Sequence, residues 1–313
     1  DCPLEHQQPV IQHPISIFMK FTCRILLAVG SLLWSSASML QAAEPLGYTV
    51  PPLSPEPTGE RHPGKFIWGD LFAEYPLQAG KFYSQVFGWN LRRLGTDSSA
   101  YWILSNGERP VAGVARRENK DQKPGSLQAR WIGYISVENL EEAAQQVIQE
   151  GGKLLLEPRA VPDRGRLAIA TDGEGTPVGL IYSDAGDPPD RMAEIGDWVW
   201  VQLFSRDPVK AVFFYQNVFG LEGVPDSRTG REDDFLLVSE GQSRAGLVPL
   251  EGDSRRGGWM GFVRVADIDE SVRTARKIGG QVLMEPAAAD QDGRIAVIAD
   301  PYGGVVGLFQ FSE

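Results

Sequence analysis

Apolar side chains recur with the helical period soon after a short aromatic stretch near the start of the folded region. The stretch FIWGDLFA, residues 66–73, is predicted to be a strand because it is short, apolar and aromatic. The apolar residues that follow fall at i, i+3, i+4, i+7 and i+8: Ala79, Phe82, Tyr83, Val86 and Phe87. This spacing predicts an amphipathic helix with one buried stripe, which Gly88 is expected to end.

The next segment predicts three short strands and then a second unit of the same kind. The strands are expected near 91–94, 100–105 and 110–116, with a hairpin at Asn106-Gly107. A strand over 129–137 precedes a second helical stripe that stops at Gly151-Gly152, and three more strands end at Tyr182. The stripe consists of Leu140, Ala143, Ala144, Val147 and Ile148. The order is therefore βαβββ, twice.

This whole pattern then repeats. Gly165–Leu180 reads GRLAIATDGEGTPVGL, and Gly293–Leu308, 128 residues later, reads GRIAVIADPYGGVVGL. Phe214-Tyr215 and Phe219-Gly220 follow their counterparts at an offset of 132. The chain is a tandem duplication with four βαβββ modules, and internal repeats of this kind define the fold.

The 313-residue length agrees with two domains. We expect a leader over 1–43, a Pro-rich linker over 44–64, a first domain over 65–183, a linker over 184–196 and a second domain over 197–313. The two linkers are predicted from their prolines, and each repeat is long enough for its own core.

The leader has the succession typical of a secretory signal peptide. Lys20 and Arg24 precede the apolar run 25–34, and small residues lead to Ala42-Ala43, where cleavage is expected. Residues 1–18 fit an over-extended gene start before Met19. An uncleaved anchor is the alternative, although the run is short for a membrane span. The sequence thus predicts export to the periplasm or medium and no stable membrane span after cleavage.

Charge and composition exclude several classes of site. The net charge of −11 belongs to residues 44–313, mostly to the repeats, and disfavours nucleic acid as a partner. Cys2 and Cys23 precede the repeats, as do all three histidines, of which His62 is expected to be exposed in the linker. The repeats therefore contain neither a cysteine nucleophile nor an imidazole base or ligand.

The ordered motifs resemble the vicinal oxygen chelate superfamily, which includes glyoxalase I, extradiol dioxygenases and bleomycin-resistance proteins. The resemblance covers nearly all of residues 65–312 and is closest to tandem glyoxalase-like proteins. It is carried by Phe82-Tyr83, Phe87-Gly88, Trp131-Ile132-Gly133-Tyr134, Gly151-Gly152, Asp172 to Leu180, and their counterparts in the second half. It implies an α+β fold with two tandem domains, each a pair of βαβββ modules that form an open, cup-shaped mixed sheet.

The resemblance also implies four positions per domain that hold a divalent metal in catalytic members, usually with His, Glu or Gln. None of these positions carries an imidazole or carboxylate here. In this chain they fall on Trp68, Ala112-Gly113, Ile132 or Tyr134, and Gly179, and on Trp200, Ala245-Gly246, Met260 or Phe262, and Gly307. We therefore predict no catalytic residue, no metal ligand and no cofactor.

Strand alternation predicts what lines the cups instead. If Trp68 points into the first cup, so do Phe66, Asp70 and Phe72, and the second cup receives Trp198, Trp200, Gln202 and Phe204. The facing strands add Tyr134 and Ser136, or Phe262 and Arg264. Apolar walls with a few polar groups are typical of ligand pockets. The candidate binding residues are Trp68, Asp70, Tyr134, Ser136, Trp200, Gln202 and Arg264.

Three functions fit this pattern. The favoured one is an exported, metal-independent protein that binds an unknown small molecule, with enzymatic activity disfavoured. A metal-dependent glyoxalase-type lyase or dioxygenase is the first alternative. The second is a structural or interaction module whose cups are filled by aromatic packing. The sequence leaves open whether the protein is a monomer or a homodimer.

Overall fold

The computed structural model describes residues 49–54, 56–96, 100–117, 128–251, 257–289 and 293–312. The predicted leader and the first five linker residues lie outside these ranges. Within them, no helix has both the length and the apolar composition that a membrane crossing requires.

The first half contains eight strands and two helices in the predicted βαβββ order. They are β1 (Phe66–Ala73), α1 (Pro76–Phe87), β2 (Asn90–Leu94), β3 (Tyr101–Asn106), β4 (Arg109–Arg116), β5 (Arg130–Ser136), α2 (Leu140–Gln149), β6 (Lys153–Val161), β7 (Gly165–Thr171) and β8 (Pro177–Ser183). Their sheet has the order β2-β3-β4-β1-β5-β8-β7-β6. Strands β1 and β5 pair antiparallel at its centre, while β4 and β8 flank them in parallel.

The second half repeats this topology. Its elements are β9 (Trp198–Ser205), α3 (Pro208–Phe219), β10 (Glu222–Pro225), β11 (Phe235–Ser239), β12 (Gln242–Pro249), β13 (Gly258–Arg264), α4 (Ile268–Lys277), β14 (Gln281–Ala289), β15 (Gly293–Ala299) and β16 (Val305–Phe311). The order β10-β11-β12-β9-β13-β16-β15-β14 matches the first sheet strand for strand. The predicted α+β fold with two open mixed sheets is confirmed.

The helices follow from local sequence signals. The predicted stripe of α1 is buried, Pro76 occupies its first turn and Gly88 ends it in the left-handed conformation at φ 72°. The Asn139 side chain caps α2 by accepting from the amides of Glu141 and Glu142. Ile148 was assigned to the buried stripe of α2, but its side chain is 59% exposed, because it lies in the last turn beyond the edge of the sheet contact.

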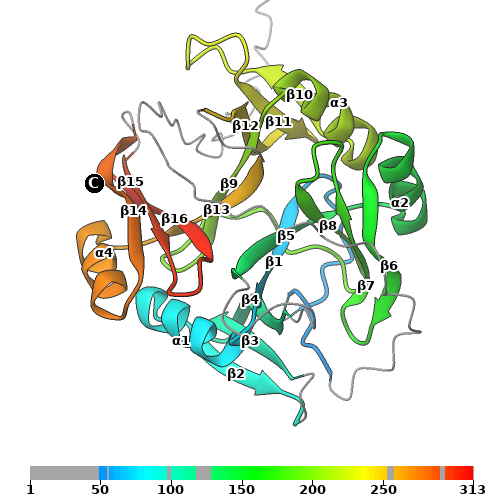
Figure 1. The fold of residues 1–313 in the computed structure, drawn as a ribbon. Coiled ribbons are helices and arrows are strands. Elements are labelled where there is room, and N and C mark those ends of the chain that lie inside the picture. Colours follow the sequence, from blue (N-terminus) through cyan, green and yellow to red (C-terminus); the bar gives the residue numbers. More distant parts are fainter. Residues whose placement is uncertain are drawn as a thin grey trace, which may run out of the picture.

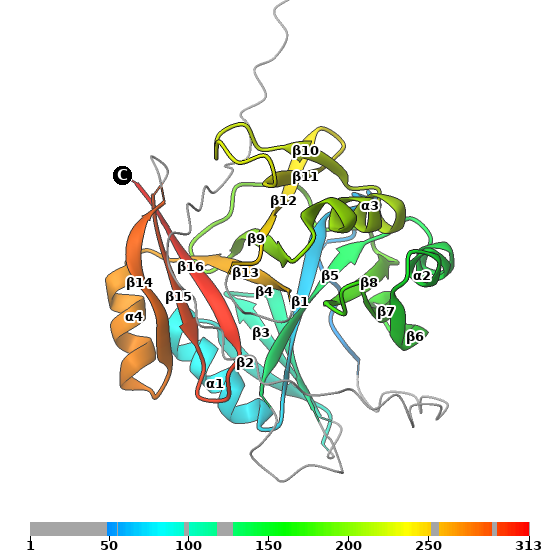
Figure 2. The same cartoon turned by 45° about the horizontal axis from the view of Figure 1, so that its top comes forward.

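The helices lie between the two sheets, so the halves pack back to back. Helix α1 contacts α4, and α2 contacts α3, as both views show (Figures 1 and 2). Two apolar cores each combine residues of both halves, one around Tyr83 and Val272 and the other around Val147 and Tyr215. The face of each sheet opposite its helices points outward, and we call it the cup of that sheet.

A reciprocal pair of tyrosines joins the halves at the repeated Asp turns. Tyr83 of α1 donates to the Gly304 carbonyl at 2.9 Å, and Tyr215 of α3 donates to Asp172 Oδ2 at 3.2 Å. Asp172 itself accepts from the amides of Glu174 and Thr176, which shapes the turn before β8. Helices α1 and α3 therefore each donate a hydrogen bond to the Asp turn of the other repeat, so the duplicated motif is part of the interface.

A β-bulge at the start of each central strand changes one prediction. The register of β1 against β5 shifts between Phe66 and Trp68, and β9 shifts likewise between Trp198 and Trp200. Phe66 and Trp198 therefore turn away from the cups and meet between the halves, with ring centroids 5.9 Å apart. The predicted placement of these two residues in the cups is wrong because strict alternation fails at a bulge.

Candidate functional site

Asp70 forms the polar centre of the first cup. Its carboxylate accepts from Trp68 Nε1 at 2.8 Å and from the Tyr101 hydroxyl in a short bond. Asp70 is 7% exposed, and this burial raises its pKa, although the Tyr101 bond and the Arg164 charge counteract part of the shift. The predicted pair Trp68 and Asp70 thus does lie together in the cup, and Tyr134 packs in the same cluster.

Arg164 is a cup residue that the sequence pattern did not reveal. It sits in the tight β6–β7 turn after Asp163, whose φ is +64°, and its side chain is 3% exposed. The guanidinium carbon lies 3.9 Å from the centroid of the Trp68 ring, which is a cation–π contact. Nη2 and Nε donate to the Pro51 carbonyl at 2.9 and 3.2 Å.

The acceptor of these bonds belongs to a segment that fills the first cup. Val50 and Leu53 are each 3% exposed and pack in one cluster with Trp68, Ile132 and Tyr134. Full burial of side chains of this kind stabilises by about 1.5–3 kcal/mol each. We call residues 50–53 the plug. The linker was predicted from its prolines to be merely extended, but its described part is packed against the first sheet.

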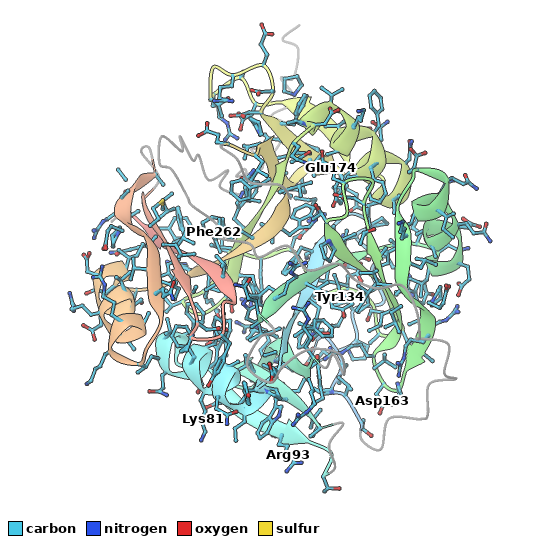
Figure 3. All side chains as sticks on the ribbon, in the orientation of Figure 1. Lys81, Arg93, Tyr134, Asp163, Glu174 and Phe262 are labelled. Carbon is cyan, nitrogen blue, oxygen red and sulfur yellow. The ribbon has the colours of Figure 1, made fainter. Side chains whose placement is uncertain are left out.

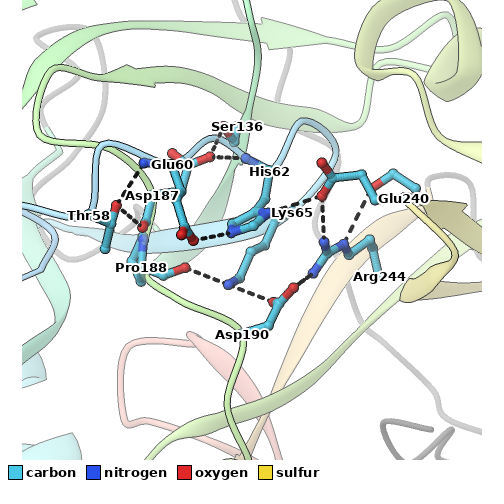
Figure 4. Close-up of polar contacts among 11 residues, drawn as sticks. Thr58, Glu60, His62, Lys65, Ser136, Asp187, Pro188, Asp190, Glu240 and Arg244 are labelled. Atoms are coloured by element: carbon cyan, nitrogen blue, oxygen red, sulfur yellow. Dashed lines mark hydrogen bonds and ion pairs between the residues drawn. The ribbon is translucent and has the colours of Figure 1, made fainter. Parts of the chain in front are cut away.

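An ionic cluster fixes the linker after the plug (Figure 4). Lys65 Nζ and Arg244 Nη1 each lie 2.7 Å from Asp190 Oδ1, which connects the residue before β1, the second linker and β12. Burial lowers the pKa of Lys65. Burial alone would raise the pKa of Asp190, but the hydrogen bonds from Arg244 and Lys65 bring it below its usual value.

His62 belongs to this cluster and is not exposed as predicted. Its side chain is 18% exposed, with Nδ1 3.0 Å from Glu240 Oε2. Its amide donates to Asp187 Oδ2 at 2.7 Å, and the same oxygen accepts from Ser136 Oγ at 2.6 Å. The linker therefore lies flat on both halves, which the proline pattern alone does not indicate.

The second cup has a different centre. Trp200 Nε1 donates to Gln202 Oε1 at 3.2 Å, and Gln202 is 3% exposed. The other amide atom, Gln202 Nε2, is buried without a hydrogen-bond partner in the described structure. Trp200 belongs to an apolar cluster. Its other members include the buried residues Met260, Phe262, Met284, Ile295, Val297 and Phe309 and the half-buried residues Val199, Phe204, Leu236, Leu283, Val305 and Phe311. Among the described residues, no counterpart of the plug enters this cluster.

Two predicted site residues contact the second linker instead. Ser136 is fully buried and its hydroxyl bonds Asp187, as described above. Arg264 Nη1 donates to the Ala193 carbonyl at 2.6 Å, while its guanidinium lies 4.7 Å from the Phe311 ring centroid, at the margin of the second cup. The structure thus brings Trp68, Asp70 and Tyr134 together in one cup and Trp200 and Gln202 in the other.

The residues at the implied metal positions do not fit a metal. A Cβ on Gly179 would lie 2.2 Å from the Tyr134 ring, and one on Gly307 would lie 2.1 Å from the Phe262 ring. Figure 3 labels both aromatic residues on the central strands. At Gly113 and Gly246 the side chains of Asp70 and Gln202 occupy the equivalent space. Neighbouring side chains therefore fill the places where carboxylate ligands would stand.

The side chains available as metal ligands also argue against a metal site. Across the described ranges, no group of three or more His, Cys, Asp or Glu side chains is arranged to hold a metal ion. Each cup centre supplies one carboxylate or amide side chain, Asp70 or Gln202, and a catalytic metal site needs about three protein ligands. No reaction step through a metal is derived for this chain.

A small cavity lies between the halves rather than in a cup. Its volume is about 30 Å³, and Phe66, Trp131, Trp198 and Trp259 line it together with backbone at Gly69 and Gly133. A space of this size holds about two water molecules. It is a packing feature of the interface and is too small for an organic ligand.

The fold defines the class of the protein. Residues 198–309 match the family described as a glyoxalase-like domain. A 2,3-dioxygenase, LapB from Pseudomonas sp. KL28, is similar in structure with a TM-score of 0.55 at 12% identity, over 81% of this chain and 94% of that one. The Mn(II)-bound glyoxalase from Novosphingobium aromaticivorans gives 0.54 at 15% identity, over 80% and 82%. The predicted resemblance is confirmed: this chain has the vicinal oxygen chelate fold, and residues 198–309 match the glyoxalase-like domain model.

Two relatives align over about four-fifths of this chain. The protein named "Putative glyoxylase CFP32" of Mycobacterium tuberculosis (strain CDC 1551 / Oshkosh) is 26% identical over 248 residues, which cover 78% of this chain and 93% of the relative. The anthracycline biosynthesis protein DauV of Streptomyces sp. (strain C5) is 26% identical over 269 residues, or 80% and 94%. Each alignment is about twice the length of one repeat and covers nearly the whole of the relative.

Proposed function

We propose that this protein is exported and binds a small apolar or aromatic molecule in its second cup without a metal. The observation that carries the proposal is the buried amide of Gln202, whose Nε2 has no partner within the described structure. Leaving a buried donor unpaired costs roughly 1–3 kcal/mol. A ligand that presents one carbonyl-type oxygen to Nε2 removes this cost, and its apolar body packs on Met260, Phe262 and Trp200.

The names of the relatives support a small-molecule ligand. One is named as a glyoxylase and another for anthracycline biosynthesis. Neither name specifies a ligand for this chain, so the ligand class rests on the cup. Its walls are aromatic and thioether side chains, which suit a flat or flexible apolar body.

Prodan, a neutral fluorescent aromatic ketone, tests the second cup directly. We expect it to bind, and Trp200→Ala to weaken binding roughly twofold to tenfold, because an aromatic contact contributes about 0.5–1.5 kcal/mol. Gln202→Leu should remove the preference for prodan over the dimethylaminonaphthalene that lacks its ketone. Asp184→Asn, on the exposed linker, is the control. Equal binding by all variants would refute the site.

A metal-dependent lyase or dioxygenase is the alternative that the solved neighbours favour, since they include a Mn(II)-bound glyoxalase and a 2,3-dioxygenase. Metal analysis of the dialysed protein separates the two proposals. We expect far less than one Zn, Ni, Fe or Mn per chain and no turnover of a glutathione hemithioacetal or a catechol. Near-stoichiometric metal that supports turnover would establish the alternative.

Export is proposed from the leader sequence alone. N-terminal sequencing of the protein from its native host should find a first residue near Ala43 or Glu44 in a fraction outside the cytoplasm. A cytoplasmic protein that retains Met19 would contradict this part of the proposal and leave the second cup unaffected.

A further inference from the structure

We propose that the first cup is a second binding site, which the chain closes with its own plug, and that its ligand is an apolar molecule bearing a carbonyl or carboxylate oxygen for Arg164. The plug shows the binding chemistry. Val50 and Leu53 supply the apolar groups, and the Pro51 carbonyl supplies the oxygen that Arg164 Nη2 and Nε contact. Tyr134 and Trp68 form the wall behind it.

The cup is built to hold an oxygen acceptor whether or not the plug is present. Arg164 is 3% exposed and stacks on Trp68, so its guanidinium is held in place from below. Asp70 accepts from Nε1 of the same Trp68 ring, so one aromatic side chain contacts both the Asp70 carboxylate and the Arg164 guanidinium. A buried guanidinium without an acceptor would be costly, so this side chain needs the Pro51 oxygen or a substitute.

The plug is attached in a way that permits its departure. Among the described residues, Thr58 is the first whose backbone hydrogen-bonds the backbone of another segment, with its amide donating to the Ala185 carbonyl at 2.9 Å, whereas the plug is bonded only through the Arg164 side chain at Pro51. The plug itself joins no strand ladder. Its firm attachment begins with the ionic cluster around His62 and Lys65 (Figure 4). Val50–Leu53 can therefore leave while the chain from Thr58 onward stays in place.

The prolines explain how so short a segment binds. Pro51 and Pro52 fix two backbone φ angles and offer no amide that would need a partner in the cup. The segment therefore loses little conformational freedom when it enters, and the tether keeps it at a high effective concentration. A free ligand has to compete with that concentration, which makes the first cup a site of lower apparent affinity than the second.

Prodan stoichiometry in the full chain tests the proposal. The double variant Val50→Asp with Leu53→Asp should expel the plug and gain one prodan site per chain over the parent. Pro57→Asp adds one carboxylate on an exposed linker residue outside the plug and should gain none. If the second cup does not bind prodan, the count rises from zero to one instead of from one to two, so the two proposals fail separately.

Two further measurements identify the new site as the first cup. A peptide of residues 49–54, Thr-Val-Pro-Pro-Leu-Ser, should displace prodan from the gained site only. Adding Arg164→Gln should abolish the preference of that site for prodan over the hydrocarbon without the ketone. If the charged pair prevents cooperative folding, Val50→Ser with Leu53→Ser takes its place. A folded variant that gains no site, or whose gained site ignores the peptide, would overturn the proposal.

Discussion

The two cups share one frame and differ in their contents. Trp68 and Trp200 occupy equivalent places, and each donates its indole N–H to the polar side chain two residues further along the strand. In the first cup that side chain is Asp70, with Arg164 and the plug above it. In the second cup it is Gln202, and the position that corresponds to Arg164 in the repeat is Asp292. The centre of the first cup is therefore a carboxylate covered by the plug, whereas the described centre of the second cup is a neutral amide.

The faces between the sheets have changed far less than the cups. Tyr83 with its Gly304 contact mirrors Tyr215 with Asp172, and Trp131 and Trp259 each pack edge-to-face on the tyrosine of their own half. Packing between the halves constrains both copies at once, because each supplies part of the two cores that lie between the sheets. The apolar cluster of each cup draws on one repeat, with the plug added in the first cup, so its residues are free to diverge. The difference indicates that duplication preserved the scaffold while the cups acquired separate roles.

The largest effect on stability should come from introducing a carboxylate at the positions where the superfamily resemblance implies a metal ligand. Gly179→Glu and Gly307→Glu each place a Cβ within 2.2 Å of the buried Tyr134 or Phe262 ring. Overpacking costs about 1–3 kcal/mol, and the buried charge adds to this, so urea unfolding should show a loss of more than about 3 kcal/mol in either half. Neither variant should acquire Mn or Zn.

Gly258→Ala is the matched control for these variants. Its Cβ would meet nothing within 4 Å, and it lies at the start of the same strand as Phe262. We expect its unfolding free energy to stay within about 0.5 kcal/mol of the parent. A Gly307→Glu protein that keeps parental stability and retains metal through dialysis would show that the second cup still accommodates the catalytic arrangement.

A smaller effect should distinguish the two tyrosines that join the halves. Tyr215→Phe leaves Trp259 Nε1, now 2.9 Å from the hydroxyl, without its acceptor and Asp172 Oδ2 without the Tyr215 donor, so about 1–3 kcal/mol should be lost. Tyr83→Phe removes one bond to the Gly304 carbonyl and should cost about 1 kcal/mol. Thermal unfolding of both variants measures the difference. Equal losses would show that the interface is more symmetric than these contacts indicate.

Local sequence patterns predicted the scaffold well. The helical stripes, the Gly88 stop and the Asn-Gly hairpin depend on neighbouring residues, and the repeat confirmed each element independently. The cup centres Trp68–Asp70 and Trp200–Gln202 also followed from alternation along one strand. Alternation failed only at the bulges, where one added residue turned Phe66 and Trp198 toward the other half.

Contacts between distant segments were not predictable. The spacing of Val50 and Leu53 does not distinguish a packed plug from an unpacked linker. The residues that the plug contacts, Trp68, Tyr134 and Arg164, come from elsewhere in the chain. His62 was assigned to solvent because its neighbours are prolines, whereas its partner Glu240 is 178 positions away. A comparison of the two halves could have singled out Arg164, since its counterpart is an acid.

The smallest effect concerns the charge of Asp70. Burial raises its pKa, so its carboxyl stabilises the fold most below its unfolded pKa of about 3.9 and loses that contribution as pH rises through the raised value. Asp70→Asn gives the first cup the neutral amide of the second. Its unfolding free energy, relative to the parent, should therefore increase between pH 4 and pH 8. The change is small because Tyr101, Trp68 and Arg164 already stabilise the ionised form.

The reciprocal change sharpens the comparison. Gln202→Glu places a carboxyl in the second cup, where burial should raise the pKa of the new group. The sequence position that corresponds to Arg164 is Asp292, so it supplies no positive counter-charge. The stability of this variant relative to the parent should fall between pH 4 and pH 8, by more than Asp70→Asn gains. Urea titrations at both pH values measure each difference, with Asp184→Asn as the exposed control. Parallel pH profiles for the two variants would show that the contrast in charge between the cups has no energetic consequence.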